Sequence, residues 1–99
     1  MNNLYENIKY SLDEELIDLI YKSKTVEITR IASSNQTTDW MSDDRLEIAI
    51  LLEGEAIIEF IDTKKTMKKG DMIKINPLTS HRVINTSPTG LWLAIYLVI

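Results

Sequence analysis

The chain has 99 residues, enough for one folded domain, and its 44% apolar and 26% charged residues are ordinary for a globular protein. Its net charge of −4 gives no basic surface for phosphates, so we expect no nucleic-acid partner. The absence of cysteine excludes disulfides, thiolate metal ligands and cysteine nucleophiles, and it agrees with a cytoplasmic location.

The first predicted element is a short α-helix within a helical segment over residues 1–24. Ser11 and Glu14 have the spacing of a capping box, in which each side chain bonds the other residue's free backbone N–H. Apolar residues then recur every three or four positions: Leu12, Leu16, Leu19 and Ile20. The N-terminus has no basic region followed by an apolar run, so we expect no signal peptide.

Residues 25–99 show the two-residue period of β-strands. The predicted strands cover residues 25–31, 46–52, 56–61, 71–75, 81–85 and 91–98. The three glycines and two prolines fall between these strands, and residues 62–65 are expected to form a polar turn. Strands at this spacing predict a sandwich or a barrel. The longest apolar run, 91–99, is far shorter than the roughly 20 residues of a membrane helix, so no membrane partner is expected.

The strand predicted at 46–52 is apolar on both sides. Glu47, Ala49 and Leu51 share one face, and the alternate residues on the other face are all leucine or isoleucine. A strand of this type is covered on both faces. One face suits the interior of a barrel, whereas the other needs the helix, another sheet or a second copy of the chain. We therefore expect a homodimer formed by sheet-to-sheet packing.

The order and spacing of a few residues point to a known family. Glu47 is followed seven residues later by Gly54, Gly70 is followed eleven later by His81, and His81 four later by Asn85. This pattern resembles the two motifs of the cupin superfamily. The resemblance implies an all-β fold, a cupin jelly-roll (double-stranded β-helix) barrel, preceded here by the one short N-terminal α-helix.

In metal-binding cupins, two histidines and a glutamate of the first motif and one histidine of the second hold a divalent ion inside the barrel. The resemblance places Glu47 and His81 at two of these four positions. The two remaining positions carry residues other than histidine: Met41 and Asp43, or Trp40 and Ser42. The standard metal site is therefore incomplete, and we expect no cofactor.

Two arrangements of the candidate site stay open. Glu47 and His81 could face each other as a hydrogen-bonded pair without metal, which is the simpler arrangement. Alternatively, Glu47, His81 and Asp43 could form a reduced metal site for manganese, iron, nickel or zinc. Candidate pocket residues also include three aromatic side chains: Trp40, Trp92 and Tyr96. Trp92 and Tyr96 suit the core, whereas Trp40 lies in a polar stretch and is either a plug over the barrel or an exposed anchor.

Three functions are compatible with these residues. The preferred one is a cupin that binds a small-molecule ligand, or a vestigial cupin, without the standard metal site. The second is a metal-dependent cupin enzyme of oxygenase or isomerase type that uses the reduced glutamate, histidine and aspartate site. The third is an interaction module whose role lies in dimerisation.

Overall fold

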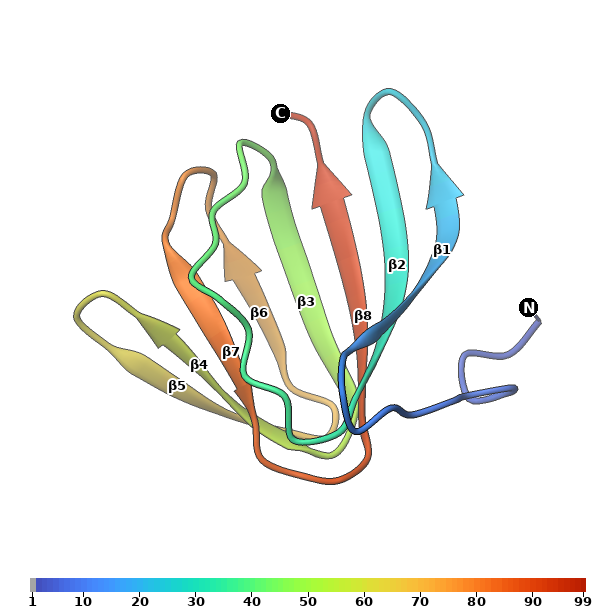
Figure 1. The fold of residues 1–99 in the computed structure, drawn as a ribbon. Helices are drawn as coiled ribbons and strands as arrows, with labels where there is room; N and C mark the ends of the chain where they lie inside the picture. Colours follow the sequence, from blue (N-terminus) through green and yellow to red (C-terminus); the bar gives the residue numbers. More distant parts are fainter. Residues whose placement is uncertain (1) are drawn as a thin grey trace.

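The computed structural model describes residues 2–99, which form eight β-strands and no helix (Figure 1). The strands are β1 Leu16–Lys22, β2 Val26–Ser33, β3 Leu46–Glu53, β4 Glu55–Phe60, β5 Lys64–Lys68, β6 Met72–Ile75, β7 His81–Asn85 and β8 Gly90–Leu97. This part of the chain therefore contains no helix that could cross a membrane.

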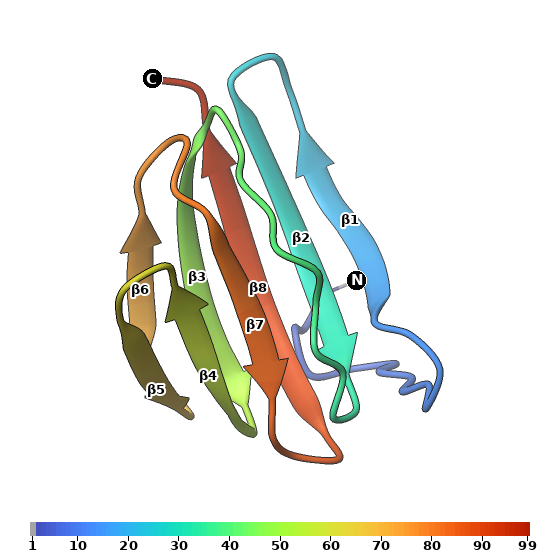
Figure 2. The same cartoon turned by 60° about the vertical axis from the view of Figure 1, so that its left-hand side comes forward.

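The strands form two antiparallel sheets that face each other (Figures 1 and 2). The larger sheet has the order β1-β2-β8-β3-β6, and the smaller has the order β5-β4-β7. Residues 34–45 run beside β7 and form two isolated bridges with it, Thr37 with Ile84 and Met41 with His81. In Figure 1 this irregular segment lies on one side of the molecule and β1 lies on the other.

A cluster of buried apolar side chains lies between the two sheets. Its members are Ala49, Leu51, Ala56, Ile58, Met67, Ile73, Ile75 and Trp92. The face of β3 that carries Ala49 and Leu51 points into this core, as its alternation predicts, because successive strand residues point to opposite sides. The fold is an all-β cupin jelly-roll.

The predicted N-terminal helix is wrong. Leu16–Lys22 is instead the edge strand β1, which pairs with β2. The Ser11 hydroxyl accepts a hydrogen bond from the Asp13 backbone N–H at 3.1 Å, in a local turn. A helix this short is marginal in water, whereas a seven-residue strand gains the backbone hydrogen bonds that the edge of β2 offers.

The other predicted strands are confirmed to within two residues at each end, and one strand was missed. The segment Lys64–Lys68 forms β5, where the sequence predicted a turn over residues 62–65. Met67 is the one buried residue of this strand, and its neighbours are lysines and a threonine. An edge strand with charged side chains gives almost no apolar alternation to detect.

Candidate functional site

His81 is held in a fixed orientation at the start of β7. The residue is 3% exposed, and its backbone N–H and carbonyl both bond to the backbone of Met41 at 2.9 Å. The ring Nδ1 lies 2.9 Å from the Thr79 carbonyl oxygen. Because a carbonyl only accepts hydrogen bonds, Nδ1 carries the proton and donates it. The other ring nitrogen, Nε2, faces Glu47.

Glu47 lies opposite His81 on β3, so the structure brings these two predicted residues together. Glu47 Oε1 and His81 Nε2 are 3.7 Å apart, which is close enough for an ion pair but too long for the predicted hydrogen bond. Burial raises the pKa of the Glu47 carboxyl; the nearby His81 opposes this shift, and Asp43 adds to it. The two groups can exchange a proton with a ligand placed between them.

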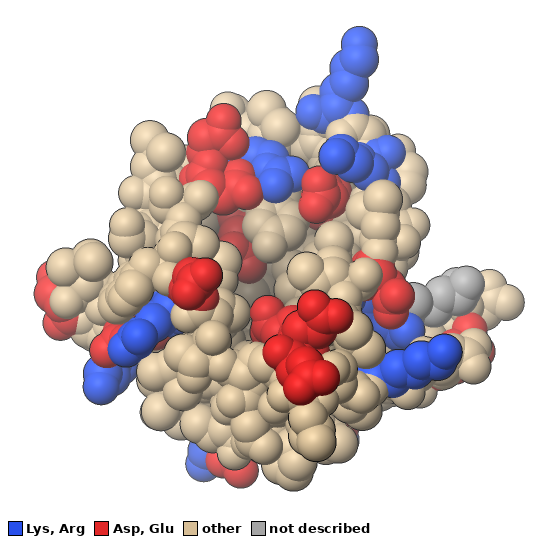
Figure 3. Space-filling view, in the orientation of Figure 1, with Lys and Arg blue, Asp and Glu red and all other residues tan. Residues whose placement is uncertain are grey.

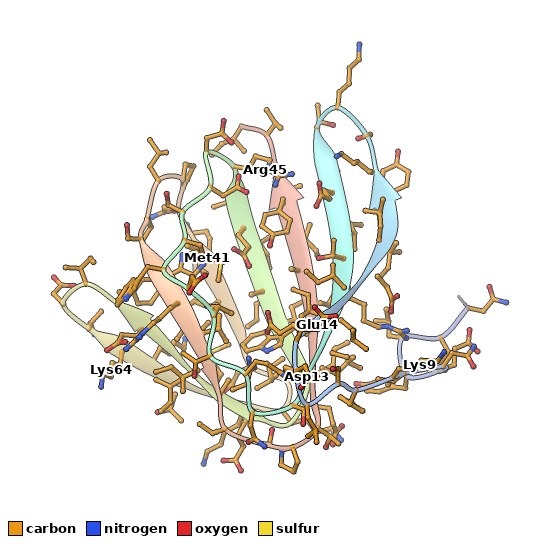
Figure 4. All side chains as sticks on the ribbon, in the orientation of Figure 1. Lys9, Asp13, Glu14, Met41, Arg45 and Lys64 are labelled. Carbon is orange, nitrogen blue, oxygen red and sulfur yellow. The ribbon has the colours of Figure 1, made fainter. Side chains whose placement is uncertain are left out.

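Asp43 is engaged elsewhere. Its two carboxylate oxygens accept hydrogen bonds at 2.9 Å from Arg45 Nε and Nη2, and this pairing lowers the pKa of Asp43 to about 2. Arg45 also pairs with Glu27 and stacks on the Tyr96 ring, with its guanidinium carbon 4.6 Å from the ring centroid. Figure 4 shows Arg45 near the end of the barrel where the C-terminus lies.

The donor set therefore does not fit the standard cupin metal centre. Within residues 2–99, no three histidine, cysteine, aspartate or glutamate side chains lie close enough together to hold an ion. Glu47 and His81 supply two donors, and the carboxylate of Asp43 is already paired with Arg45. Divalent transition metals in proteins generally need three or four protein ligands.

Trp92 and Tyr96 both line the cavity between the sheets, on β8. The Trp92 indole N–H donates to Asn85 Oδ1 at 2.9 Å, so its one polar atom is satisfied and its ring packs in the core. Tyr96 lies directly across from Glu47 in the pairing of β3 with β8. Burial and, to a smaller extent, the Glu47 charge raise the pKa of Tyr96.

Trp40 does not line the cavity. Its side chain is among the exposed large apolar residues, and the Arg82 guanidinium stacks over its ring at 5.2 Å. The next residue, Met41, does line the cavity, on the segment that runs beside β7 (Figure 4). Of the two arrangements that the sequence left open for Trp40, the structure thus shows the exposed one.

The cavity has a volume of about 150 Å³. Its lining is mostly apolar and is completed by a few polar groups: Glu15, Thr38, Glu47 and His81. Figure 3 shows the face of the molecule hollowed near its centre, with both acidic and basic side chains around the hollow. An apolar cavity of this volume holds one benzene ring.

Glu15 was missed at the sequence level because it lay in the predicted helix. It is half-buried, and its Oε2 accepts a hydrogen bond from Asn85 Nδ2 at 3.2 Å. Asn85 in turn accepts from Trp92 and donates to the Gln36 carbonyl oxygen. Burial raises the pKa of Glu15, and the bond from Asn85 partly offsets this.

Replacing Glu15 with glutamine is expected to stabilise the fold at neutral pH, by on the order of 1 kcal/mol. The amide oxygen still accepts from Asn85, and the cost of a half-buried carboxylate is removed. Because the pKa of Glu15 is raised in the folded state, its carboxylate lowers stability above that pKa and has no effect once both states are protonated. The gain should therefore fade below about pH 4.

Urea unfolding at several pH values measures this effect. Glu14→Gln, at an exposed neighbouring position, is the matched control and should change little at any pH. A loss of stability in Glu15→Gln at neutral pH, or a gain that persists in acid, would show that the Glu15 carboxylate is not penalised by burial.

The comparisons with known proteins agree with this architecture. The chain is similar to a crystal structure from Ralstonia eutropha JMP134 that carries the provisional name mannose-6-phosphate isomerase: identity is 24%, the TM-score is 0.91, and the match covers 100% of this chain and 98% of that one. A cupin superfamily protein from Desulfitobacterium hafniense DCB-2 is 19% identical, with a TM-score of 0.85 and coverage of 93% and 84%. KdgF from Halomonas sp. is 12% identical, with a TM-score of 0.77 and coverage of 84% and 79%.

These identities are low, so the likeness to solved structures carries the fold alone. The comparison with curated proteins gave no match. The family model described as a cupin domain matches residues 29–96, more than half of the sequence. The chain belongs to the cupin domain family.

Proposed function

We propose that this cupin binds a small organic ligand inside the barrel, without the standard cupin metal centre. The observation that carries the proposal is the cavity of about 150 Å³, whose apolar lining surrounds the facing side chains of Glu47 and His81. Ligand sites in proteins combine an apolar lining with a small number of placed polar groups. Glu47 and His81 supply those groups, and Trp92 and Tyr96 supply flat apolar contact.

A sugar phosphate, such as the substrate named for the Ralstonia protein, does not suit this cavity. A phosphate group needs lysine, arginine or a metal to balance its charge. The residues that line the cavity include neither lysine nor arginine, and they include two carboxylates, Glu15 and Glu47. The fold that the two proteins share therefore does not imply that this chain binds the same substrate.

Thermal unfolding in the presence of phenol tests the proposal. A ligand that binds the folded state alone raises the melting temperature, and above its Kd the rise grows with the logarithm of the ligand concentration. We expect this rise in the unaltered protein. It should be lost in Val83→Phe, because Val83 lines the cavity and the phenyl ring of the variant would fill it. Ile84→Phe, on the opposite face of β7, is the matched control and should retain the rise. No rise in the unaltered protein, or an equal rise in Val83→Phe, would contradict the proposal.

We further propose that two copies associate through the outer face of the larger sheet. Most of the half-buried residues on this face of β2, β8 and β3 are apolar: Val26, Ile28, Leu93, Ile95, Leu97, Leu46, Ile48 and Ile50. Figures 1 and 2 show that residues 2–99 place no second layer over this side of β3 and β8, apart from the N-terminal segment at one end. A second copy of the same face matches this surface, because each apolar row then covers the other.

Replacing Ile95 with lysine is expected to shift the protein from dimer to monomer in sedimentation velocity, because a charge would be buried at the centre of the apolar face. Ile57→Lys places the same charge on the outer side of the smaller sheet and should leave the dimer intact. Sedimentation of the unaltered protein as a monomer at high concentration would contradict the proposed homodimer.

A further inference from the structure

The charges around the cavity disfavour one class of ligand. Its ionisable lining residues are Glu15, Glu47, His81 and Tyr96, and its lining contains no lysine or arginine. The guanidinium of Arg45 is directed to Asp43, Glu27 and the Tyr96 ring. A buried anion that lacks a paired cation is strongly penalised. Carboxylate, phosphate and sulfate ligands are therefore poorly matched to this cavity.

The two facing polar side chains define what the ligand must offer. With the proton of His81 on Nδ1, where the Thr79 carbonyl holds it, Nε2 is an acceptor in the neutral ring. The Glu47 carboxylate also accepts hydrogen bonds, and at 3.7 Å these two atoms do not bond each other. A hydroxyl group supplies the missing donor, because it can donate a hydrogen bond to either of these two acceptors.

The other residues that line the cavity restrict the size and the polarity of the ligand. Apart from Glu15 and Thr38, the groups around the Glu47 and His81 side chains are apolar or aromatic, including Ala49, Ile58, Val83 and Trp92. The volume of about 150 Å³ is filled by a single ring. Glu15 Oε2 already accepts a hydrogen bond from Asn85, so Glu47 is the carboxylate that faces His81 and the ligand.

We propose that the cavity takes an uncharged molecule about one ring in size that carries a hydroxyl group, such as a phenol or a small cyclic alcohol, and that it rejects anions of the same size. This inference rests on the proposed function, because it names the ligand class of the same cavity. The hydroxyl lies between Glu47 and His81, and the ring lies against the apolar wall.

Isothermal titration with four probes of similar size tests the ligand class at neutral pH: phenol, toluene, benzoate and benzylammonium. Toluene matches the shape of phenol and lacks the hydroxyl, whereas benzoate and benzylammonium add a negative or a positive charge. We expect phenol to bind about tenfold more tightly than toluene, since one satisfied buried hydrogen bond has this effect. Benzoate should bind at least as weakly as toluene.

The outcomes separate the two proposals. The proposed ligand class would be wrong if toluene bound as tightly as phenol, or if either charged probe bound more tightly than phenol. The cavity would still be a binding site in both cases. No binding by any of the four probes would overturn the proposed function itself. These arms use the unaltered protein, so they do not depend on the folding of any variant.

Substitutions then locate the hydroxyl. Glu47→Leu and His81→Phe each remove one of the two facing acceptors, and at least one of them should narrow the phenol-to-toluene ratio to near one. Glu55→Leu is the matched control at an exposed position and should keep the tenfold ratio. A ratio that neither cavity variant narrows would contradict the placement of the hydroxyl between Glu47 and His81.

Discussion

Replacing Arg30 with methionine is expected to lower the free energy of unfolding by about 3 kcal/mol, because three backbone carbonyls and Asp18 would lose the guanidinium that donates to them. Its side chain is 4% exposed. Nε and Nη2 donate to Asp18 Oδ2 at 3.2 and 2.9 Å. The other donors reach the backbone carbonyls of Leu4, Glu6 and Asn7. Arg30 thereby links β2 to its neighbour β1 through Asp18, and it binds the backbone of the N-terminal segment.

Urea unfolding at one fixed protein concentration measures the loss, and limited proteolysis reports the release of the N-terminal segment. Arg82→Met is the matched control, since Arg82 also pairs with a carboxylate, that of Glu59, but its side chain is 35% exposed. A partly exposed pair of this kind contributes less than about 1 kcal/mol. Equal losses in the two variants would show that Arg30 acts as an ordinary surface charge.

Gly54→Ala is expected to destabilise the fold by about 2 to 5 kcal/mol. Gly54 joins β3 to β4 with φ of +91°, a conformation that costs an alanine about 1 to 2 kcal/mol. An added Cβ would also collide with the Ser87 hydroxyl and lie 2.7 Å from the Thr89 carbonyl oxygen. Relief of that overlap requires the turn between β7 and β8 to move, which adds about 1 to 3 kcal/mol.

Gly70→Ala separates the two contributions. Gly70 has nearly the same φ, +88°, but an added Cβ would meet nothing within 4 Å. This variant should lose about 1 to 2 kcal/mol from backbone strain alone. Thermal or urea unfolding of both variants measures the difference. If Gly70→Ala were as destabilising as Gly54→Ala, the packing of Ser87 and Thr89 against Gly54 would carry none of the effect.

Much of the fold could be predicted from the sequence because its turns and strands are locally marked. Gly54 and Gly70 both adopt positive φ in turns between strands, as their positions after apolar alternating runs indicate. The N-terminal element could not be predicted, since Leu16–Lys22 fits a helical period and a strand period alike. Its pairing with β2 and the bond from Arg30 to Asp18 are distant in the sequence, and they decide the outcome.

The candidate site could likewise be predicted where its residues lie on strands, and not where they lie outside them. Glu47, His81, Trp92 and Tyr96 were predicted, and all four line one cavity because strand register fixes the direction of each side chain. Asp43 and Trp40 lie in the irregular segment 34–45, where no period states which way a side chain points. There, contacts with Arg45 and Arg82 hold Asp43 and Trp40 outside the cavity.

The central claim is that the space between Glu47, His81 and the apolar wall is a binding site. Methyl NMR during a phenol titration tests it most directly, because lining residues on four different strands carry methyl groups: Ala49, Ile58, Ile75 and Val83. We expect saturable shifts confined to these and other cavity methyls, and unchanged shifts for the methyls of the outward-facing Ile48 and Ile95. Shifts that do not saturate, or that appear first on the outer face of the larger sheet, would contradict it.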